Sequence, residues 1–198
     1  VWIGLFQKGI YMQPGKAMPF GYMGYKLGEQ NIIGTACVVS TLIDSKGQTW
    51  IGTDKDGLYC LKSRTNVTHY APSANFPSTI MSIAESSDGR IWIGSYMEGF
   101  GWLDPQSKSY HKYSDSRFNA ISAFSMRSTP NNLWVATMGQ GLLQLNLNEN
   151  SLKAHAVKEG VPHDSTANNI VNNYISQISV SPDGNRIYAA TTMGLCCY

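Results

Sequence analysis

The feature that most constrains the fold is an aromatic and glycine motif that recurs along the chain. In its clearest copy, Trp50-Ile51-Gly52-Thr53 is followed by Gly57, seven residues after the Trp. Aromatic anchors stand at positions 2, 50, 92, 134 and 188, so the steps are 48, 42, 42 and 54 residues. A period in the forties with several short strand patterns per unit is typical of β-propeller blades. The motif therefore predicts a repeat protein.

Each unit contains up to four short apolar patterns joined by turn residues such as Ser87-Asp88-Gly89, a strong hairpin signal. No segment has a sustained apolar period near 3.6, so no helix is expected. The fold class predicted is all-β: a β-propeller of antiparallel four-stranded blades, present as a partial arc of about four to five blades. We expect a single partial propeller over 1–198, with an incomplete blade at 1–27, blades at 37–71, 79–114 and 121–158, and an incomplete blade at 175–198.

The small residues two positions after each Trp predict how the blades pack. These are Gly52, Gly94 and Ala136. A small side chain there allows neighbouring sheets to approach closely, while the large Trp can cap the next blade.

Composition excludes some classes of function. Charged residues make up 14% of the chain, and the formal net charge is +2 without a Lys/Arg cluster, which argues against nucleic-acid binding. No apolar run approaches the roughly eighteen residues of a membrane helix. Cys60 and Cys197 occupy equivalent repeat positions and are expected to be small buried strand residues. His69, His111 and His155 fall in separate blades, so we expect neither a shared metal nor a cofactor.

The signature Trp-Ile-Gly-[Thr/Ser]-x3-Gly-[Leu/Phe], preceded by Asp-Gly as in residues 83–94, resembles the two-component regulator propeller repeat. The resemblance implies a periplasmic sensor region of a hybrid two-component system. In such proteins a glycan-derived oligosaccharide is often the ligand, and a histidine kinase lies elsewhere in the full-length chain. The implied partners are this ligand, the remaining blades and downstream domains of the same protein, and a second copy of the chain. This segment carries no kinase motif, so we expect no catalysis from it.

Candidate ligand residues follow from the loop geometry of a propeller. The loops that join one blade to the next share a face with the loops between second and third strands, and ligands usually meet that face. A sugar site needs an aromatic plane and polar partners for hydroxyls. Phe76 could supply a plane, whereas Trp102 is expected in the blade core. The candidate ligand-binding residues are Asp54, Asp56, Tyr96, Glu98, Arg117, Phe118 and Gln140.

Two other functions remain open. A propeller can act as a protein–protein interaction scaffold, or it can be a lyase or glycan-active enzyme. Sialidase-type propellers carry Asp-boxes, and Asp44-x-x-Gly47-x-Thr49-Trp50 misses that pattern by one residue. Lyase propellers need a metal-linked His and Glu pair, and the sequence nominates none. A non-enzymatic sensor is therefore favoured.

Overall fold

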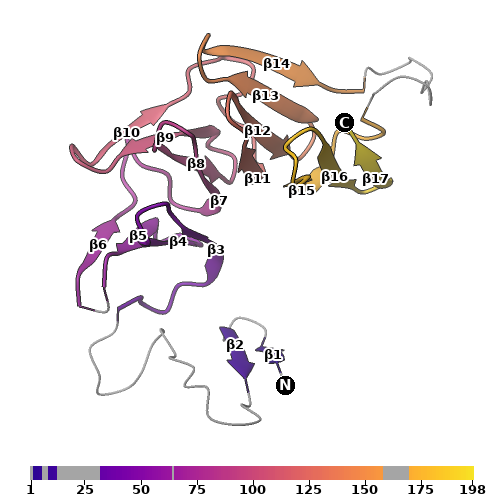
Figure 1. Ribbon diagram of the computed structural model, residues 1–198. Helices are drawn as coiled ribbons and strands as arrows, with labels where there is room; N and C mark the ends of the chain where they lie inside the picture. The colour runs from indigo at the N-terminus through magenta and orange to yellow at the C-terminus, as the bar shows by residue number, and fades with distance from the viewer. Residues whose placement is uncertain (1, 6–8, 13–31, 64, 158–169) are drawn as a thin grey trace.

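The computed structural model describes residues 2–5, 9–12, 32–63, 65–157 and 170–198. These residues form β-strands joined by turns and loops, and they include no helix (Figure 1). A helix long and apolar enough to cross a membrane is accordingly not found in this part of the chain. The structure confirms the predicted all-β class.

The strands form antiparallel meanders in chain order. A two-stranded sheet of β1 (Trp2–Leu5) and β2 (Gly9–Met12) comes first. Blade I contains β3 (Val38–Ile43), β4 (Thr49–Thr53), β5 (Leu58–Leu61) and β6 (Val67–Tyr70). Blade II contains β7 (Ile80–Glu85), β8 (Ile91–Ser95), β9 (Phe100–Asp104) and β10 (Ser109–Lys112). Blade III contains β11 (Ala123–Ser128), β12 (Asn132–Thr137), β13 (Leu142–Asn146) and β14 (Ser151–His155). Blade IV contains β15 (Ile175–Val180), β16 (Ile187–Thr191) and β17 (Gly194–Cys197).

Strand positions agree with the repeat pattern to within about two residues. The third complete blade, for example, is expected from 121, and its first strand begins at Ala123. Gly57 precedes β5 with a φ of 72°. Most of the incomplete blade expected at 1–27 and most of the connection between the blades expected at 121–158 and 175–198 lie outside the described residues.

The first strand of each blade lies innermost, and these strands contact one another in sequence order. The pairs are β3 with β7, β7 with β11, and β11 with β15. The four blades consequently follow one another along an arc, with β6, β10 and β14 at the outer edges (Figure 1).

The anchors Trp50, Trp92 and Trp134 each pack into the core that their blade shares with the following one, as the sequence predicts. Trp50 is 1% exposed and packs with Ile80 and Ile91 of blade II. Trp92 packs with Met126 and Leu133 of blade III. Burial of this apolar area is the main source of cohesion between blades.

The predicted close approach at the small residues is also confirmed. A Cβ atom added to Gly52 would lie 2.7 Å from Ile80 Cγ2. A Cβ added to Gly94 would lie 2.7 Å from the Ala123 carbonyl oxygen. Ala136, the counterpart in blade III, is fully buried. A larger side chain at these positions would push adjacent sheets apart.

Hydrogen bonds from serine side chains, which the sequence does not predict, link neighbouring inner strands. Each inner strand has a register shift near its start, typical of a β-bulge, for instance between Ile80 and Ser82. Next to these bulges, Ser40 Oγ donates to the Ile80 carbonyl at 3.0 Å, and Ser82 Oγ donates to the Ala123 carbonyl at 2.8 Å. Because a bulge interrupts the strand ladder, it leaves a carbonyl that accepts a bond from the serine of the preceding blade.

The prediction for the cysteines is half right. Cys60 is buried in the core between blades I and II. Cys197 occupies the equivalent register position, opposite Tyr188, but is exposed. No described sheet packs against that side of blade IV, so the expected burial of Cys197 is wrong. All four cysteines are free thiols in the structure.

Candidate ligand-binding site

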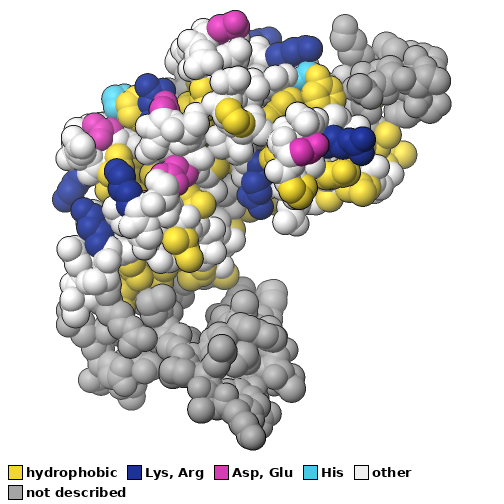
Figure 2. Space-filling model, in the orientation of Figure 1, with side chains coloured by type: hydrophobic (Ala, Val, Ile, Leu, Met, Phe, Trp, Pro, Cys, Tyr) yellow, Lys and Arg dark blue, Asp and Glu magenta, His cyan; other side chains and the backbone are white. Residues whose placement is uncertain are grey.

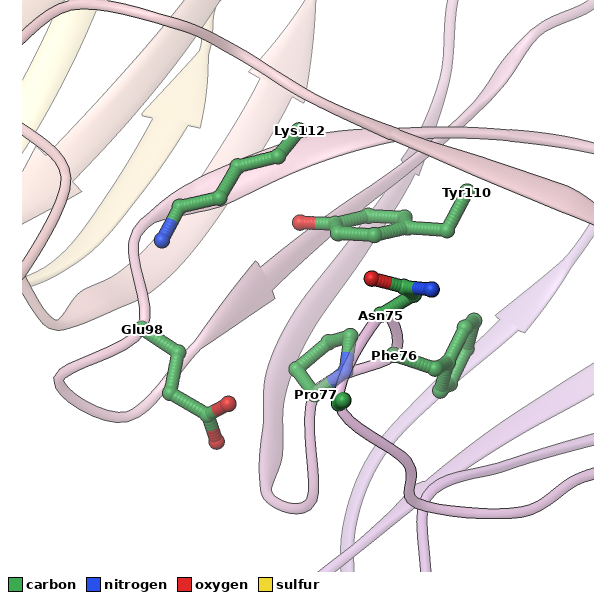
Figure 3. A pocket seen from close by; sticks show the side chains of 7 residues that line it. Asn75, Phe76, Pro77, Glu98, Tyr110 and Lys112 are labelled. Carbon is green, nitrogen blue, oxygen red and sulfur yellow. The ribbon is translucent and has the colours of Figure 1, made fainter.

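A pocket of about 240 Å³ lies between the outer parts of blades I and II. Its walls come from the loop that joins β6 to β7, the loop that joins β8 to β9, and the edge strand β10 (Figure 3). The lining side chains that matter chemically are Asn75, Phe76, Pro77, Glu98, Tyr110 and Lys112. The pocket belongs to the loop face on which the sequence places a ligand.

The loop between β6 and β7 is fixed by its own hydrogen bonds. The amides of Ser73 and Phe76 donate to each other's carbonyls at 3.1 and 3.2 Å. The Phe76 ring is buried between Tyr70, at a centroid distance of 5.9 Å, and the edge of Tyr110, at 5.5 Å. This anchor leaves Asn75 exposed beside the pocket.

Glu98 is held by the residues that immediately precede β7. Its Oε1 atom accepts bonds from the Ser78 amide at 3.1 Å and from the Ser78 hydroxyl at 3.0 Å. Within the described residues its Oε2 atom has no hydrogen-bond donor, so a ligand could supply one. The half-buried carboxylate is thereby held in one orientation, which lowers the entropy cost of binding.

Tyr110 and Lys112 alternate along β10 and therefore share one side of the sheet. The Tyr110 hydroxyl oxygen is buried and has no hydrogen-bond partner among the described residues. Figure 3 shows it directed toward the space bounded by Lys112 and Glu98. Burial, and then the negative charge of Glu98, raise the pKa of Tyr110, so the phenol stays protonated. It can therefore donate a hydrogen bond.

The pocket combines an amide, a carboxylate, an ammonium and a phenol with the apolar surfaces of Phe76 and Pro77. Its formal charges, on Glu98 and Lys112, are opposite. Such a lining offers donors and acceptors without selecting a strongly charged ligand. On the face shown in Figure 2, Lys/Arg and Asp/Glu side chains are interspersed rather than gathered by sign.

Only Glu98 of the seven predicted residues lines this pocket. Asp54 accepts a bond from the Thr79 hydroxyl at 3.0 Å. Asp56 accepts one from the Tyr59 hydroxyl at 2.6 Å. These two carboxylates therefore order their own loop.

The remaining predicted residues are scattered over the loop face. Tyr96 is 50% exposed and Gln140 is exposed, so both are accessible to a ligand. Arg117 is exposed, forms an ion pair with Asp115 at 2.7 Å and covers the Phe118 ring at 4.9 Å.

The prediction that Phe118 offers a plane to a sugar is wrong. Phe118 is 5% exposed and packs in the core shared by blades II and III, where Phe100 and Ile121 surround it. Phe76, also suggested as a plane, is 8% exposed and reaches the pocket only at its margin. Trp102 packs against the same blade II–III core, as expected.

Sequence reasoning missed Tyr110 and Lys112 because it treated the fourth strands only as outer edges. The alternation Tyr110-His111-Lys112 was the available signal, since residues two apart face the same neighbouring blade. The three strand histidines have separate environments: His69 beside Asp56, His111 on Trp102 and His155 on Gln144. The described residues contain no group of three His, Cys, Asp or Glu side chains that could hold a metal.

The pocket loop and the following two strands carry the family signature. Residues 76–97 match the two component regulator propeller family. This stretch runs from Phe76 in the pocket, through β7 and β8, to Met97, the residue before Glu98. The match confirms the resemblance drawn from the repeat motif. Among curated proteins, none matches the chain.

Solved structures with a similar fold support the propeller architecture. The extracellular domain of a protein described as a hybrid two component system from B. thetaiotaomicron has a TM-score of 0.71 and 24% identity, and the match covers 100% of this chain and 25% of that one. PorZ of the type-IX secretion system of Porphyromonas gingivalis has a TM-score of 0.61 and 16% identity, over 80% of this chain and 25% of that one. Virginiamycin B lyase from Staphylococcus aureus has a TM-score of 0.56 and 17% identity, over 81% of this chain and 55% of that one. The chain thus spans about a quarter of the length of the first two structures, and the proteins with this fold include both a two component system and a lyase.

Proposed function

We propose that the chain is part of an extracytoplasmic sensor propeller of a two-component system and binds a neutral oligosaccharide in the pocket between blades I and II. The observation that carries this proposal is the pocket lining, in which a fixed carboxylate and a buried phenol face an amide and an ammonium. The match of residues 76–97 to the two component regulator propeller family supports the sensor role.

A sugar fits this lining because each hydroxyl group can donate and accept a hydrogen bond. Glu98 Oε2 accepts, while the Tyr110 hydroxyl and the Lys112 ammonium donate. The amide of Asn75 can do both. Since the charges of Glu98 and Lys112 oppose each other, the pocket favours a neutral saccharide over an anionic one.

The position of the pocket gives a route for transmitting ligand binding. The Ser78 amide donates a hydrogen bond to Glu98 in the pocket wall. The Ser78 carbonyl oxygen accepts a hydrogen bond from the Gly57 amide of blade I at 2.9 Å. A ligand that tightens Glu98 and Asn75 would therefore bias the packing between two blades. In this proposal the segment performs no chemistry. The segment lies in the periplasm, and the signal passes through the remaining blades and downstream domains to a histidine kinase elsewhere in the same full-length inner-membrane protein. Two copies of the chain associate in this proposal.

A partner-protein interface is the second candidate. Large apolar side chains are exposed on the loops between second and third strands: Tyr96 at 50%, Met97 at 60% and Met138 at 38%. Such residues on one loop face favour docking of another protein or domain.

Calorimetric titration of the purified protein with neutral gluco-, manno-, xylo- and arabino-oligosaccharides tests the proposal. We expect one class to bind and Glu98→Gln to weaken it at least tenfold, since a charged acceptor is lost. Glu85→Gln is the matched control, because Glu85 also accepts bonds from the amide and hydroxyl of one serine, Ser45, at 2.7 and 2.6 Å. No binding by any saccharide, or equal losses in the two variants, would refute the sugar pocket. Tight binding of a protein partner alongside no saccharide binding would favour the second candidate.

A further inference from the structure

A second cavity, of about 440 Å³, lies between the outer parts of blades II and III. It is separated from the first pocket by the β10 strand, in which the residue Lys112 borders both. The lining side chains that carry the argument are Arg90, Trp102, His111, Leu147 and Asn150. We call this cavity the blade II–III groove.

Strand register explains why aromatic and cationic groups meet in this groove. Trp92, Trp102 and His111 stand directly opposite one another on β8, β9 and β10. They therefore share the side of blade II that faces blade III. Trp92 fills the core near the axis, whereas Trp102 is only partly buried and His111 is exposed at the edge.

The Trp102 indole is covered by two basic side chains. The imidazole of His111 stacks on it with a centroid distance of 4.1 Å and an interplanar angle of 17°. The guanidinium carbon of Arg90 lies 4.7 Å from the centre of the Trp102 rings. The aromatic face stabilises a cation in this position. The planar guanidinium group of Arg90 is therefore oriented before a ligand binds.

The charge of the groove is positive. The basic residues Arg90 and His111 direct their side chains to it, and none of its lining residues is Asp or Glu. Asp88, which lies outside the lining, pairs with the Nε atom of Arg90 at 3.3 Å. No protein acceptor engages the terminal guanidinium nitrogens of Arg90 among the described residues. These nitrogens form the fork that matches a carboxylate.

The remaining walls suit a hydroxylated ring. Leu147 and the Trp102 edge supply apolar surface, and Asn150 supplies an amide. We propose that the blade II–III groove is a second binding site, specific for a sugar acid, with Arg90 binding the carboxylate. His111 lies beside the anion, and the sugar ring lies against Leu147. This site is independent of the neutral-oligosaccharide pocket, because its electrostatics select the opposite class of saccharide.

Titration of the purified protein with sodium glucuronate, followed by calorimetry and by tryptophan fluorescence, tests the assignment. Glucuronate should bind at least tenfold more tightly than glucose, which has the same ring without the charge. Arg90→Gln should weaken glucuronate binding at least tenfold. The glucuronate affinity of Arg90→Lys should lie between those of Arg90→Gln and the native protein, because lysine keeps the charge but lacks the planar guanidinium fork.

Arg117→Gln is the matched control. Arg117 also pairs with an aspartate two residues earlier and also covers an aromatic ring, Phe118, but it lies outside the groove. Its replacement should leave glucuronate binding unchanged. Equal losses in Arg90→Gln and Arg117→Gln, or equal affinity for glucuronate and glucose, would overturn the proposal. Inorganic sulfate that competes as tightly as glucuronate would also overturn it, because the site would then recognise an oxyanion without the sugar. Circular dichroism of each variant identifies loss of fold, and if Arg90→Gln unfolds, the result with Arg90→Lys decides.

Discussion

At the scale of single residues, Tyr110 is the side chain whose environment is most unusual. Its hydroxyl is buried without a partner in the described part of the protein, a state that costs free energy in the absence of ligand. Tyr59 offers the opposite case, since its buried hydroxyl donates to Asp56 at 2.6 Å.

We predict that Tyr110→Phe stabilises the protein, by about 1 kcal/mol in the free energy of unfolding, because an unsatisfied polar group is removed. Tyr59→Phe should destabilise it by a similar amount, because the Asp56 carboxylate loses a donor. Urea unfolding of the two variants measures both changes. Equal destabilisation in both would show that the Tyr110 hydroxyl already has a partner in solution.

His155 makes stability depend on pH. Its Nε2 atom lies 3.0 Å from Gln144 Oε1, and its ring lies 4.5 Å from Tyr198. Burial, and then the positive charge of Lys153, lower the pKa of His155. The unfolded chain therefore binds a proton more readily than the folded one once the pH falls below the ordinary histidine pKa of about 6.5.

The contribution of His155 should consequently be fully favourable above pH 6.5. It should be lost as the pH falls from 6.5 through the folded-state pKa, and then level off. Urea midpoints at pH 8 and pH 5 measure this loss. His155→Gln should reduce the difference between the two midpoints. An unchanged difference in His155→Gln would contradict the assignment.

At the scale of secondary-structure elements, the distance between inner strands is set by Gly52, Gly94 and Ala136. Ser82, opposite Gly94 in register, donates its hydroxyl to the Ala123 carbonyl of the next blade. The glycine leaves room for both the serine and its acceptor. Packing and hydrogen bonding between blades therefore depend on the same small residue.

Gly94→Ala should destabilise the protein by about 1–3 kcal/mol, because the new Cβ would lie 2.7 Å from the Ala123 carbonyl oxygen and would force the inner strands apart. Gly34→Ala is the control, since the atom nearest to its added Cβ is Asp56 Oδ2 at 3.8 Å. Thermal or urea unfolding compares the two. A loss for Gly94→Ala no larger than that for Gly34→Ala would contradict the packing role.

The repeat motif predicts the strands well because its residues act locally. Gly52 and its counterparts Gly94 and Ala136 each pair with a serine of the first strand of their blade. One copy of the motif therefore predicts the others. Asp44, part of a near miss to an Asp-box, has a structural role: it accepts bonds from the Trp50 indole at 2.9 Å and from the Gln48 amide at 2.8 Å. The bulges beside Ser40 and Ser82 could not be predicted, since they depend on how one blade meets the next.

The candidate site was harder to predict for the same reason. The sequence predicts Glu98 as a ligand residue because it lies in a loop between second and third strands, and these loops differ from one repeat to the next. Tyr110 and Lys112 belong to an edge strand, and their role depends on the neighbouring blade. The prediction for Phe118 is wrong because the position of a residue in a loop does not determine whether its side chain is buried. Phe118 packs with Phe100 in the core shared by blades II and III.

At the scale of the whole molecule, the four blades place two cavities in successive spaces between sheets. The first is balanced in charge and the second is positive. Both depend on the outer strands, where blades diverge and side chains no longer interlock. Variation in loops and edge strands can therefore change ligand preference without disturbing the inner core.

The most direct test of the sensor proposal is a map of amide ¹H–¹⁵N chemical shifts during titration with the neutral oligosaccharide that binds in calorimetry. The largest changes should occur in residues 74–78, at Glu98 and in residues 110–112. Shifts concentrated in the opposite turns, such as 45–47 and 87–89, or no shifts at saturating saccharide, would contradict it.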